Sequence, residues 1–178
     1  MSLEELFHLL LVQSGAGWAL IGAMLAVMFG GIGSARGIRI AAAEGAGVMS
    51  EKPELFGRLL PLMALPGTQG FYGLICAIMM ARYTNLIKGA MTIGPLPGLG
   101  LLAVGFGAGM VFWRSAVFQG ETSAAAIALV AKRPDQVGRS ILLPALVETY
   151  AVVALLAAIL LIIWLTKAEL TLPTSIGG

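Results

Sequence analysis

The chain has 178 residues, of which 58% are hydrophobic and 11% are charged, and glycine alone contributes 24 of them. This composition excludes an ordinary soluble domain and is typical of a helical membrane protein whose helices approach one another closely. The formal net charge of +2 is too small to indicate a nucleic-acid partner. We therefore expect an all-α, multi-pass integral membrane protein surrounded by lipid.

Four apolar stretches are long enough to cross a bilayer, which takes about 20 helical residues. They run over residues 10–46, 55–83, 98–131 and 141–165, and we expect each to form a helix. Pro53 and Pro134 suit the first turn of helices two and four, because a missing N–H costs nothing there. The first and third stretches are longer than a bilayer is thick, so both helices are expected to protrude from it.

The four predicted helices form two related halves. A shift of 81 residues places Pro53 on Pro134 and Arg58 on Arg139, and ten of the 28 positions between 53 and 80 are identical. Helices one and three match under a shift of 77 residues, where AVMFGG (26–31) meets AVGFGA (103–108). The difference of four residues is about one helical turn and preserves the helix face. The sequence predicts two tandem helical hairpins, residues 10–83 and 95–168.

The basic residues predict how the chain is oriented. Eight of the 11 Lys and Arg residues flank the first and third connections, residues 47–54 and 132–139. They are Arg36, Arg39, Lys52, Arg58, Arg114, Lys132, Arg133 and Arg139, whereas Arg82, Lys88 and Lys167 lie toward the other side. Because basic residues concentrate on the cytoplasmic side, we expect both connections in the cytoplasm and both termini outside.

Helices one and three carry glycine at spacings of three or four residues, which lets helix backbones approach within van der Waals contact. One interpretation is helix packing within a single chain, and the other is an inner ring of helices from many copies, which the presence of two glycine-faced helices per chain favours. The glycine-containing run GIGSARG (31–37) lies within apolar helix and follows no strand, so we do not interpret it as a nucleotide-binding loop. We predict no catalytic residue and no nucleotide site in this chain.

Glu148 is the only acidic residue deep within any predicted span. An unpaired carboxylate costs at least several kcal/mol at that depth. It is either a permanently protonated residue with a structural hydrogen bond or a group that binds and releases a cation. Under the 81-residue shift Glu148 corresponds to Gly67, and a structural glutamate would be expected in both halves. We therefore favour the cation-binding role.

Polar groups on helix two are candidate partners for this carboxylate. Leu65, Thr68, Gln69 and Tyr72 follow the spacing i, i+3, i+4 and i+7, so they share one helix face. Pro66 removes an N–H, which can free a backbone carbonyl near Leu65. Tyr72 either donates a hydrogen bond to the carboxylate or simply packs.

A hard-oxygen site with one negative charge can be assembled from these groups and one amide on helix three. Its candidate ligands are the Leu65 carbonyl, the Thr68 hydroxyl, the Gln69 and Gln119 amide oxygens and the Glu148 carboxylate. Neutral dipoles can replace the water of a small alkali cation while one carboxylate cancels its charge. A proton needs only the carboxylate. This set of groups therefore favours an alkali cation over a proton.

At LPGTQGFYG (65–73), Gln119 and Glu148, the chain resembles the rotor-ring proteolipid of V-type ATPases, subunit K, in its duplicated four-helix form. The resemblance covers essentially the whole chain and is strongest to the sodium-translocating members. It implies that the Na⁺ ligands are Leu65 through its carbonyl, Thr68, Gln69, Gln119 and Glu148. It also implies that Tyr72 donates the hydrogen bond that closes the site at Glu148.

The resemblance further implies a homo-oligomeric ring in a prokaryotic cell membrane. This ring turns against a stator membrane subunit whose arginine displaces the ion from Glu148, and central-stalk subunits contact the cytoplasmic connections. The chain itself is then a non-catalytic subunit, since ATP is hydrolysed elsewhere in the complex. Three alternatives remain open: a proton-carrying subunit of the same family, a small secondary transporter or channel, and a structural membrane adaptor.

Overall fold

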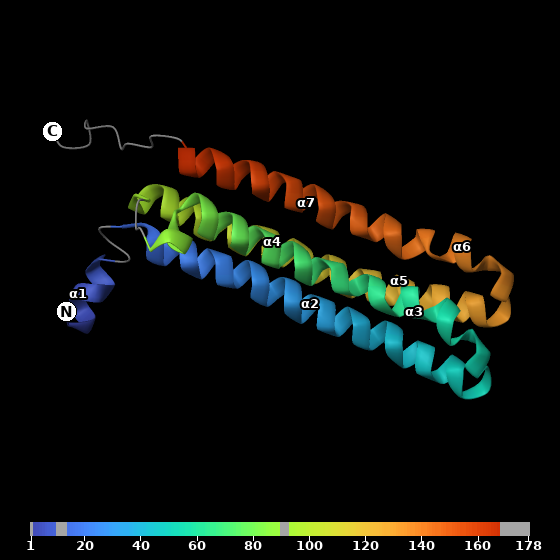
Figure 1. Ribbon diagram of the computed structural model, residues 1–178. Helices are drawn as coiled ribbons and strands as arrows, with labels where there is room; N and C mark the ends of the chain where they lie inside the picture. Colours follow the sequence, from blue (N-terminus) through green and yellow to red (C-terminus); the bar gives the residue numbers. More distant parts are fainter. Residues whose placement is uncertain (1, 10–13, 90–92, 168–178) are drawn as a thin grey trace.

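A bundle of long helices forms the computed structural model, which describes residues 2–9, 14–89 and 93–167. Within these ranges four helical spans are long and apolar enough to cross a membrane. They are Ala16–Glu51, Pro53–Tyr83, Pro95–Lys132 and Pro134–Lys167. The connection between spans one and two and that between spans three and four lie at the same end of the bundle (Figure 1). The predicted all-α architecture with four spans is confirmed.

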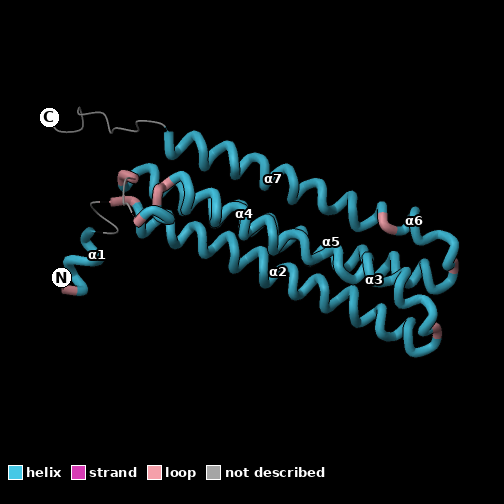
Figure 2. Tube along the Cα trace, viewed as in Figure 1, coloured by secondary structure: helices cyan, strands magenta, loops and turns pink. Residues whose placement is uncertain are grey.

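The first and third spans are single helices, whereas the second is interrupted by a 3₁₀ turn and the fourth by the short non-helical segment beside α6 (pink in Figure 2). The uninterrupted helices are α2 (Ala16–Glu51) and α5 (Pro95–Lys132). Span two consists of η2 (Pro53–Leu55), α3 (Phe56–Ala64), η3 (Leu65–Gly67) and α4 (Thr68–Tyr83). Span four consists of η5 (Pro134–Gln136), α6 (Val137–Ser140) and α7 (Leu142–Lys167). The short elements α1 (Leu3–Phe7) and η4 (Leu86–Lys88) lie outside the spans.

Each predicted helix overlaps an observed span, but the first and last residues of the spans differ from the predicted ones. The lengths of α2 and α5, 36 and 38 residues, correspond to about 54 and 57 Å and exceed a bilayer of about 30 Å. The predicted start of helix one falls on residues 10–13, which lie outside the described residues. Sequence reasoning missed α1, although Ser2 and Glu5 form the S-x-x-E capping box that marks such a start.

The contact between α2 and α5 is extensive, and glycines on both helices let the two backbones approach closely. Gly105 meets the backbone of Gly22, and Gly120 meets that of Gly37, so the two helices run parallel in the same order. A Cβ atom added to either α5 glycine would overlap the facing backbone. The interpretation of the glycine stripes as packing within one chain therefore accounts for these four positions.

Glycine also sets the approach of α4 to α2. A Cβ atom on Gly30 would lie 2.6 Å from the carbonyl oxygen of Gln69, and one on Gly73 would overlap the backbone of Ala26. The backbone that carries Gln69 is therefore held directly against α2. This contact fixes the depth and the rotation of the polar segment of span two.

A polar layer divides the interior of the bundle into two apolar parts. One apolar cluster contains Cys76 and Phe112, and the other contains Leu62 and Ile127. Gln69 and Gln119 are fully buried at chain positions between these clusters on the second and third spans. Polar side chains without solvent must find partners nearby, and the candidate site is built from those partnerships.

Basic side chains join the two connections at one end of the bundle. Lys52 donates a hydrogen bond from Nζ to the carbonyl oxygen of Ala131 at 2.7 Å. Arg58 donates to the carbonyl oxygen of Pro134 at 3.1 Å. Cations at the C-terminal end of a helix satisfy its last carbonyl groups and its dipole. The two hairpins are therefore tied together at this end as well as along α2 and α5.

Candidate ion-binding site

The break in span two positions the first candidate ligands. The chain leaves α3 at Ala64, makes the 3₁₀ turn η3 and resumes α-helix at Thr68. Pro66 causes this break because it has no N–H and its ring crowds the preceding turn. The Leu65 carbonyl accepts a hydrogen bond from the Thr68 N–H and another from the Thr68 hydroxyl at 3.1 Å.

The effect predicted for Pro66 needs a correction in its detail. A missing N–H at position 66 deprives the carbonyl four residues earlier, that of Leu62, of its helical partner. The Leu65 carbonyl instead has two donors, both from Thr68. The turn therefore does not free the Leu65 carbonyl by a lost bond, although one of its two donors is a hydroxyl that can rotate.

Thr68 and Gln69 connect this turn to the third span. The Thr68 hydroxyl lies 3.3 Å from Gln69 Oε1, and Gln69 Nε2 donates to Gln119 Oε1 at 2.6 Å. Both glutamine side chains are fully buried. The predicted buried amide of Gln119 is therefore confirmed, and it faces the polar face predicted for span two.

Glu148 lies on α7 and receives one neutral donor at each carboxylate oxygen. The Tyr72 hydroxyl donates to Oε1 at 2.5 Å, and Gln119 Nε2 donates to Oε2 at 3.3 Å. The Tyr72 ring also packs edge-on against Phe112, with ring centroids 6.0 Å apart. Both roles considered for Tyr72, donation and packing, are therefore realised. Since a phenol and an amide carry no formal charge, they orient the carboxylate without neutralising it.

These contacts place the predicted site residues in one hydrogen-bonded network. The network runs from Tyr72 through Glu148, Gln119, Gln69 and Thr68 to the carbonyl of Leu65. It draws on three helical spans and contains a single ionisable carboxylate. Such an arrangement can exchange its internal hydrogen bonds for bonds to one small cation, because amide and hydroxyl oxygens are good ligands for hard cations.

Sequence reasoning missed two serines beside this network. Ser115 Oγ donates to the carbonyl of Val147 at 3.3 Å and lies 3.5 Å from Gln69 Nε2. Ser34 Oγ accepts a hydrogen bond from the N–H of Gly70 at 2.8 Å. A usable signal was present in the sequence, because Ser34 lies between Gly30 and Gly37 on the small-residue face of α2.

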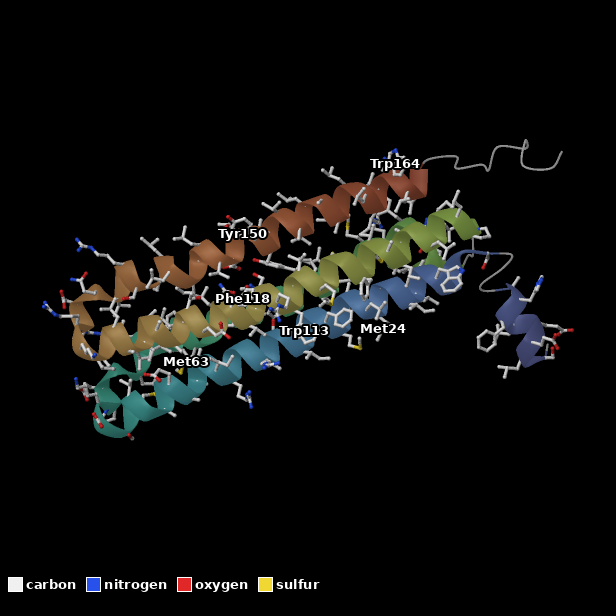
Figure 3. All side chains as sticks on the ribbon, turned by 180° about the vertical axis from the view of Figure 1, so that it is seen from behind. Met24, Met63, Trp113, Phe118, Tyr150 and Trp164 are labelled. Atoms are coloured by element: carbon white, nitrogen blue, oxygen red, sulfur yellow. The ribbon has the colours of Figure 1, made fainter. Side chains whose placement is uncertain are left out.

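Tyr150 shows that closeness to Glu148 in sequence does not place a residue in the site. It follows Glu148 by two residues, yet it lies on the outer edge of α7 (Figure 3) and is 74% exposed. Successive helical positions differ by about 100°, so a step of two residues turns a side chain away from its neighbour. The site therefore depends on helix faces rather than on short motifs in span four.

Comparison with known proteins identifies the family. The family model for the ATP synthase C subunit matches the chain twice, over residues 21–80 and 102–161. The chain is 32% identical over 156 residues to the V-type sodium ATPase subunit K of Enterococcus hirae, covering 88% of this chain and 97% of the relative. It is 38% identical over 147 residues to the A-type ATP synthase subunit K of Methanocaldococcus jannaschii, covering 82% of this chain and 63% of that relative.

The two family matches bear on the internal repeat. They start 81 residues apart, at 21 and 102, which is the shift that aligns spans two and four. The duplication is therefore confirmed, whereas the limits 10–83 and 95–168 stay predictions. With four apolar spans, the protein is a multi-pass integral membrane protein. The chain belongs to the family of the ATP synthase C subunit, in a duplicated form with four helical spans.

Proposed function

We propose that this chain carries sodium ions in the rotor ring of a rotary V-type ATPase, with Glu148 as the ion-carrying residue. One observation supports this proposal above the others: the network between α4, α5 and α7 gathers several neutral oxygens around a single half-buried carboxylate. Family membership supports the rotor role, since members of this family form oligomeric rings with other membrane and stalk subunits.

Sodium fits the chemistry of this network. On span two, the Thr68 hydroxyl oxygen lies 3.1 Å from the Leu65 carbonyl oxygen and 3.3 Å from Gln69 Oε1. Sodium would take its oxygen ligands from these groups, from Gln119 and from Glu148. The carboxylate then cancels the charge of the ion, while the neutral dipoles replace its hydration shell. The name of the Enterococcus hirae relative, V-type sodium ATPase subunit K, points to the same ion.

Tyr72 would act as the latch of the site. Its hydroxyl holds one carboxylate oxygen, which leaves the other oxygen and the amides to face the ion. During rotation, an arginine of the stator membrane subunit would displace the ion from Glu148. The ion would then leave toward one side of the membrane, and the emptied site would refill from the other.

The orientation follows from the basic residues. We place connections 47–54 and 132–139 in the cytoplasm, where central-stalk subunits would contact them, and both termini outside. The hydrogen bonds of Lys52 and Arg58 across the two connections give the stalk one joined surface rather than two separate loops. A prokaryotic cell membrane is the setting that the Enterococcus relative supports.

One carboxylate for four spans has a mechanical consequence. A ring of a given circumference would carry half as many ions per turn as a ring of two-span subunits with one carboxylate each. Each ion would therefore receive a larger share of the energy released by ATP hydrolysis. This ratio favours pumping against a steep gradient over ATP synthesis.

Carbodiimide modification of Glu148 in the purified ring tests the choice of ion. A hydrophobic carbodiimide reacts with a protonated carboxyl group, so a bound sodium ion should protect Glu148. We expect millimolar or lower sodium to slow the reaction at neutral pH, potassium to protect far less, and lower pH to restore the reaction. If sodium gives no protection at any pH, the ring carries protons and the sodium proposal is wrong.

The size of the detergent-extracted particle tests the rotor role itself. A ring predicts a large particle of many copies, whereas a secondary transporter or channel predicts a monomer or dimer. A structural adaptor predicts instead that Glu148→Gln leaves ion transport by the complete complex intact. Each alternative therefore has a result that supports it and contradicts the rotor proposal.

A further inference from the structure

Two buried serines hold the turns that carry the two halves of the candidate site. Ser34 lies on α2 and Ser115 on α5, and each side chain is only 6% exposed. Each bonds the backbone of a different outer segment, Gly70 on α4 for Ser34 and Val147 on α7 for Ser115. These backbone positions directly follow Gln69 and directly precede Glu148.

Ser34 acts on the neutral half of the site. Its hydroxyl accepts the Gly70 N–H at 2.8 Å, a distance typical of a good hydrogen bond. A Cβ atom on Gly70 would lie 3.3 Å from this hydroxyl, so glycine at position 70 lets the two helices approach closely enough for the bond. One turn away, Gly30 contacts the backbone of Gln69. Ser34 and Gly30 together fix the turn that presents Thr68 and Gln69.

Ser115 acts on both halves of the site. It donates to the Val147 carbonyl at 3.3 Å and lies 3.5 Å from Gln69 Nε2, a longer contact. It also precedes Gln119 by four residues, so both side chains project from the same face of α5. Ser115 therefore lies where the α7 turn carrying Glu148, the amide of Gln69 and the α5 face carrying Gln119 come together.

We propose that Ser34 and Ser115 are positioning residues that set the separation between the neutral ligands on α4 and the carboxylate on α7. This inference rests on the ion site proposed above. The two serines do not bind the ion. They act through the backbone at Gly70 and Val147, since a binding site has to be held within about 0.5 Å of its productive geometry by surrounding contacts.

Ser123 shows that burial alone does not create this role. It is fully buried on α5, two turns beyond Ser115, and its hydroxyl has no hydrogen-bond partner among the residues that the structure describes. Replacing it with alanine removes the same atom from the same helix without removing a backbone tether. Ser123→Ala is therefore the matched control for Ser115→Ala.

The experiment measures how sodium protects Glu148 from a carbodiimide in purified rings of full-length chain. For Ser115→Ala we expect the sodium concentration for half protection to rise about three- to tenfold, the effect of losing one buried hydrogen bond. Ser34→Ala should raise it by about two- to fivefold on the same basis. Ser123→Ala should leave it unchanged. Ser115→Thr, which keeps the hydroxyl, should restore the wild-type value.

Two further readouts separate positioning from a merely structural role. The temperature at which the ring dissociates should be the same for Ser115→Ala and Ser123→Ala, although only the former changes sodium protection. Ser115→Cys keeps the size of the side chain but bonds weakly, so its half-protection value should fall between those of the wild type and Ser115→Ala. Equal sodium protection in Ser34→Ala, Ser115→Ala and Ser123→Ala overturns the inference.

The outcome for the wild-type ring keeps this inference distinct from the sodium proposal. If sodium fails to protect the wild-type ring, the sodium proposal is wrong whatever the serine variants do. The inference is then read from the pH at which modification of Glu148 is half-maximal. A shift in Ser115→Ala but not in Ser123→Ala supports it, and no shift in either overturns it.

Discussion

The first and second hairpins have the same ancestry but divide the work of the site between them. Position 67 of the first is glycine where position 148 of the second is glutamate, and Gln69 corresponds to Tyr150. In the structure Gln69 is fully buried and Tyr150 is 74% exposed. The first hairpin therefore supplies neutral oxygens alone, whereas the second supplies the charge together with the amide of Gln119.

The two hairpins also differ in how closely their helices pack. In the first hairpin, Gly30 and Gly73 bring α2 and α4 into backbone contact, and Pro66 breaks the second span. In the second, the position of Gly73 is held by Ala154, and α7 runs unbroken past Glu148. A groove of about 370 Å³ remains between α5 and α7, lined by small residues that include Ala103, Gly107 and Ala154. Losing the glycine contact leaves the second hairpin more open.

The comparison teaches how a duplicated membrane hairpin can specialise. A single carboxylate is costly in a bilayer, so keeping one charge instead of two lowers that cost. The copy without the charge keeps oxygen-bearing side chains and adds a proline break that orients them. Four substitutions test this contrast, and their expected effects decrease from Glu148→Gln to Pro66→Ala.

Glu148→Gln removes the one carboxylate of the hydrogen-bonded network, and it should abolish ion carriage. The amide keeps the shape of the side chain, and its oxygen can still accept the hydrogen bond from Tyr72, so the ring should assemble. We expect complete loss of carbodiimide modification and of sodium-dependent transport by the reconstituted complex. Glu121→Gln, at an exposed position on α5, is the control and should transport normally. Transport at the wild-type rate by Glu148→Gln would show that Glu148 does not carry the ion.

Gly105→Ala tests the contact that joins the two hairpins. The added Cβ atom would overlap the backbone of Gly22, so α2 and α5 must separate. We expect a loss of about 1–3 kcal/mol in the free energy of unfolding, the usual cost of overpacking a tight interface. Denaturant titration of the chain in detergent measures it. Gly107→Ala, two residues along and with no atom within 4 Å of its added Cβ, should change this free energy little.

Tyr72→Phe removes the latch that the first hairpin extends to the second. The loss of a hydrogen bond to a carboxylate should weaken sodium protection of Glu148 by about tenfold or more. The ring contact of Tyr72 with Phe112 is kept, so stability should change less than ion binding. Tyr150→Phe removes a phenol from the exposed face of α7 and should leave protection unchanged. Equal effects of the two variants would contradict the role given to Tyr72.

Pro66→Ala makes span two resemble the unbroken α7. Without the proline, the turn Leu65–Gly67 can relax toward α-helix, which changes the direction of the Leu65 carbonyl. We expect sodium protection to weaken about twofold, since one neutral ligand is misdirected rather than removed. Pro61→Ala, at an exposed position in α3, controls for the loss of a proline in the same span. A larger loss of sodium protection in Pro61→Ala than in Pro66→Ala would show that the break in span two does not orient the site.

Much of the site could be predicted because helical spacing determines which residues share a face. The spacing of Leu65, Thr68, Gln69 and Tyr72 predicts their common face, and the depth of Glu148 in an apolar run predicts that it needs partners. The structure places these groups and Gln119 in one network. Sequence reasoning missed Ser34, although it lies on the small-residue face of α2, and it missed Ser115, because helical spacing does not show which backbone group a serine hydroxyl bonds.

Composition and short-range spacing are enough to predict the class of the protein, its four spans, its duplication and the polar residues that the structure joins in one network. These features depend on composition and on periods of a few residues, which a bilayer constrains strongly. The sequence does not show that Gly22 meets Gly105, that Gln69 bonds Gln119 or that a groove lies between α5 and α7, and these features come from the packing of whole helices. Such contacts join residues tens of positions apart, and they depend on how closely and at what rotation whole helices pack.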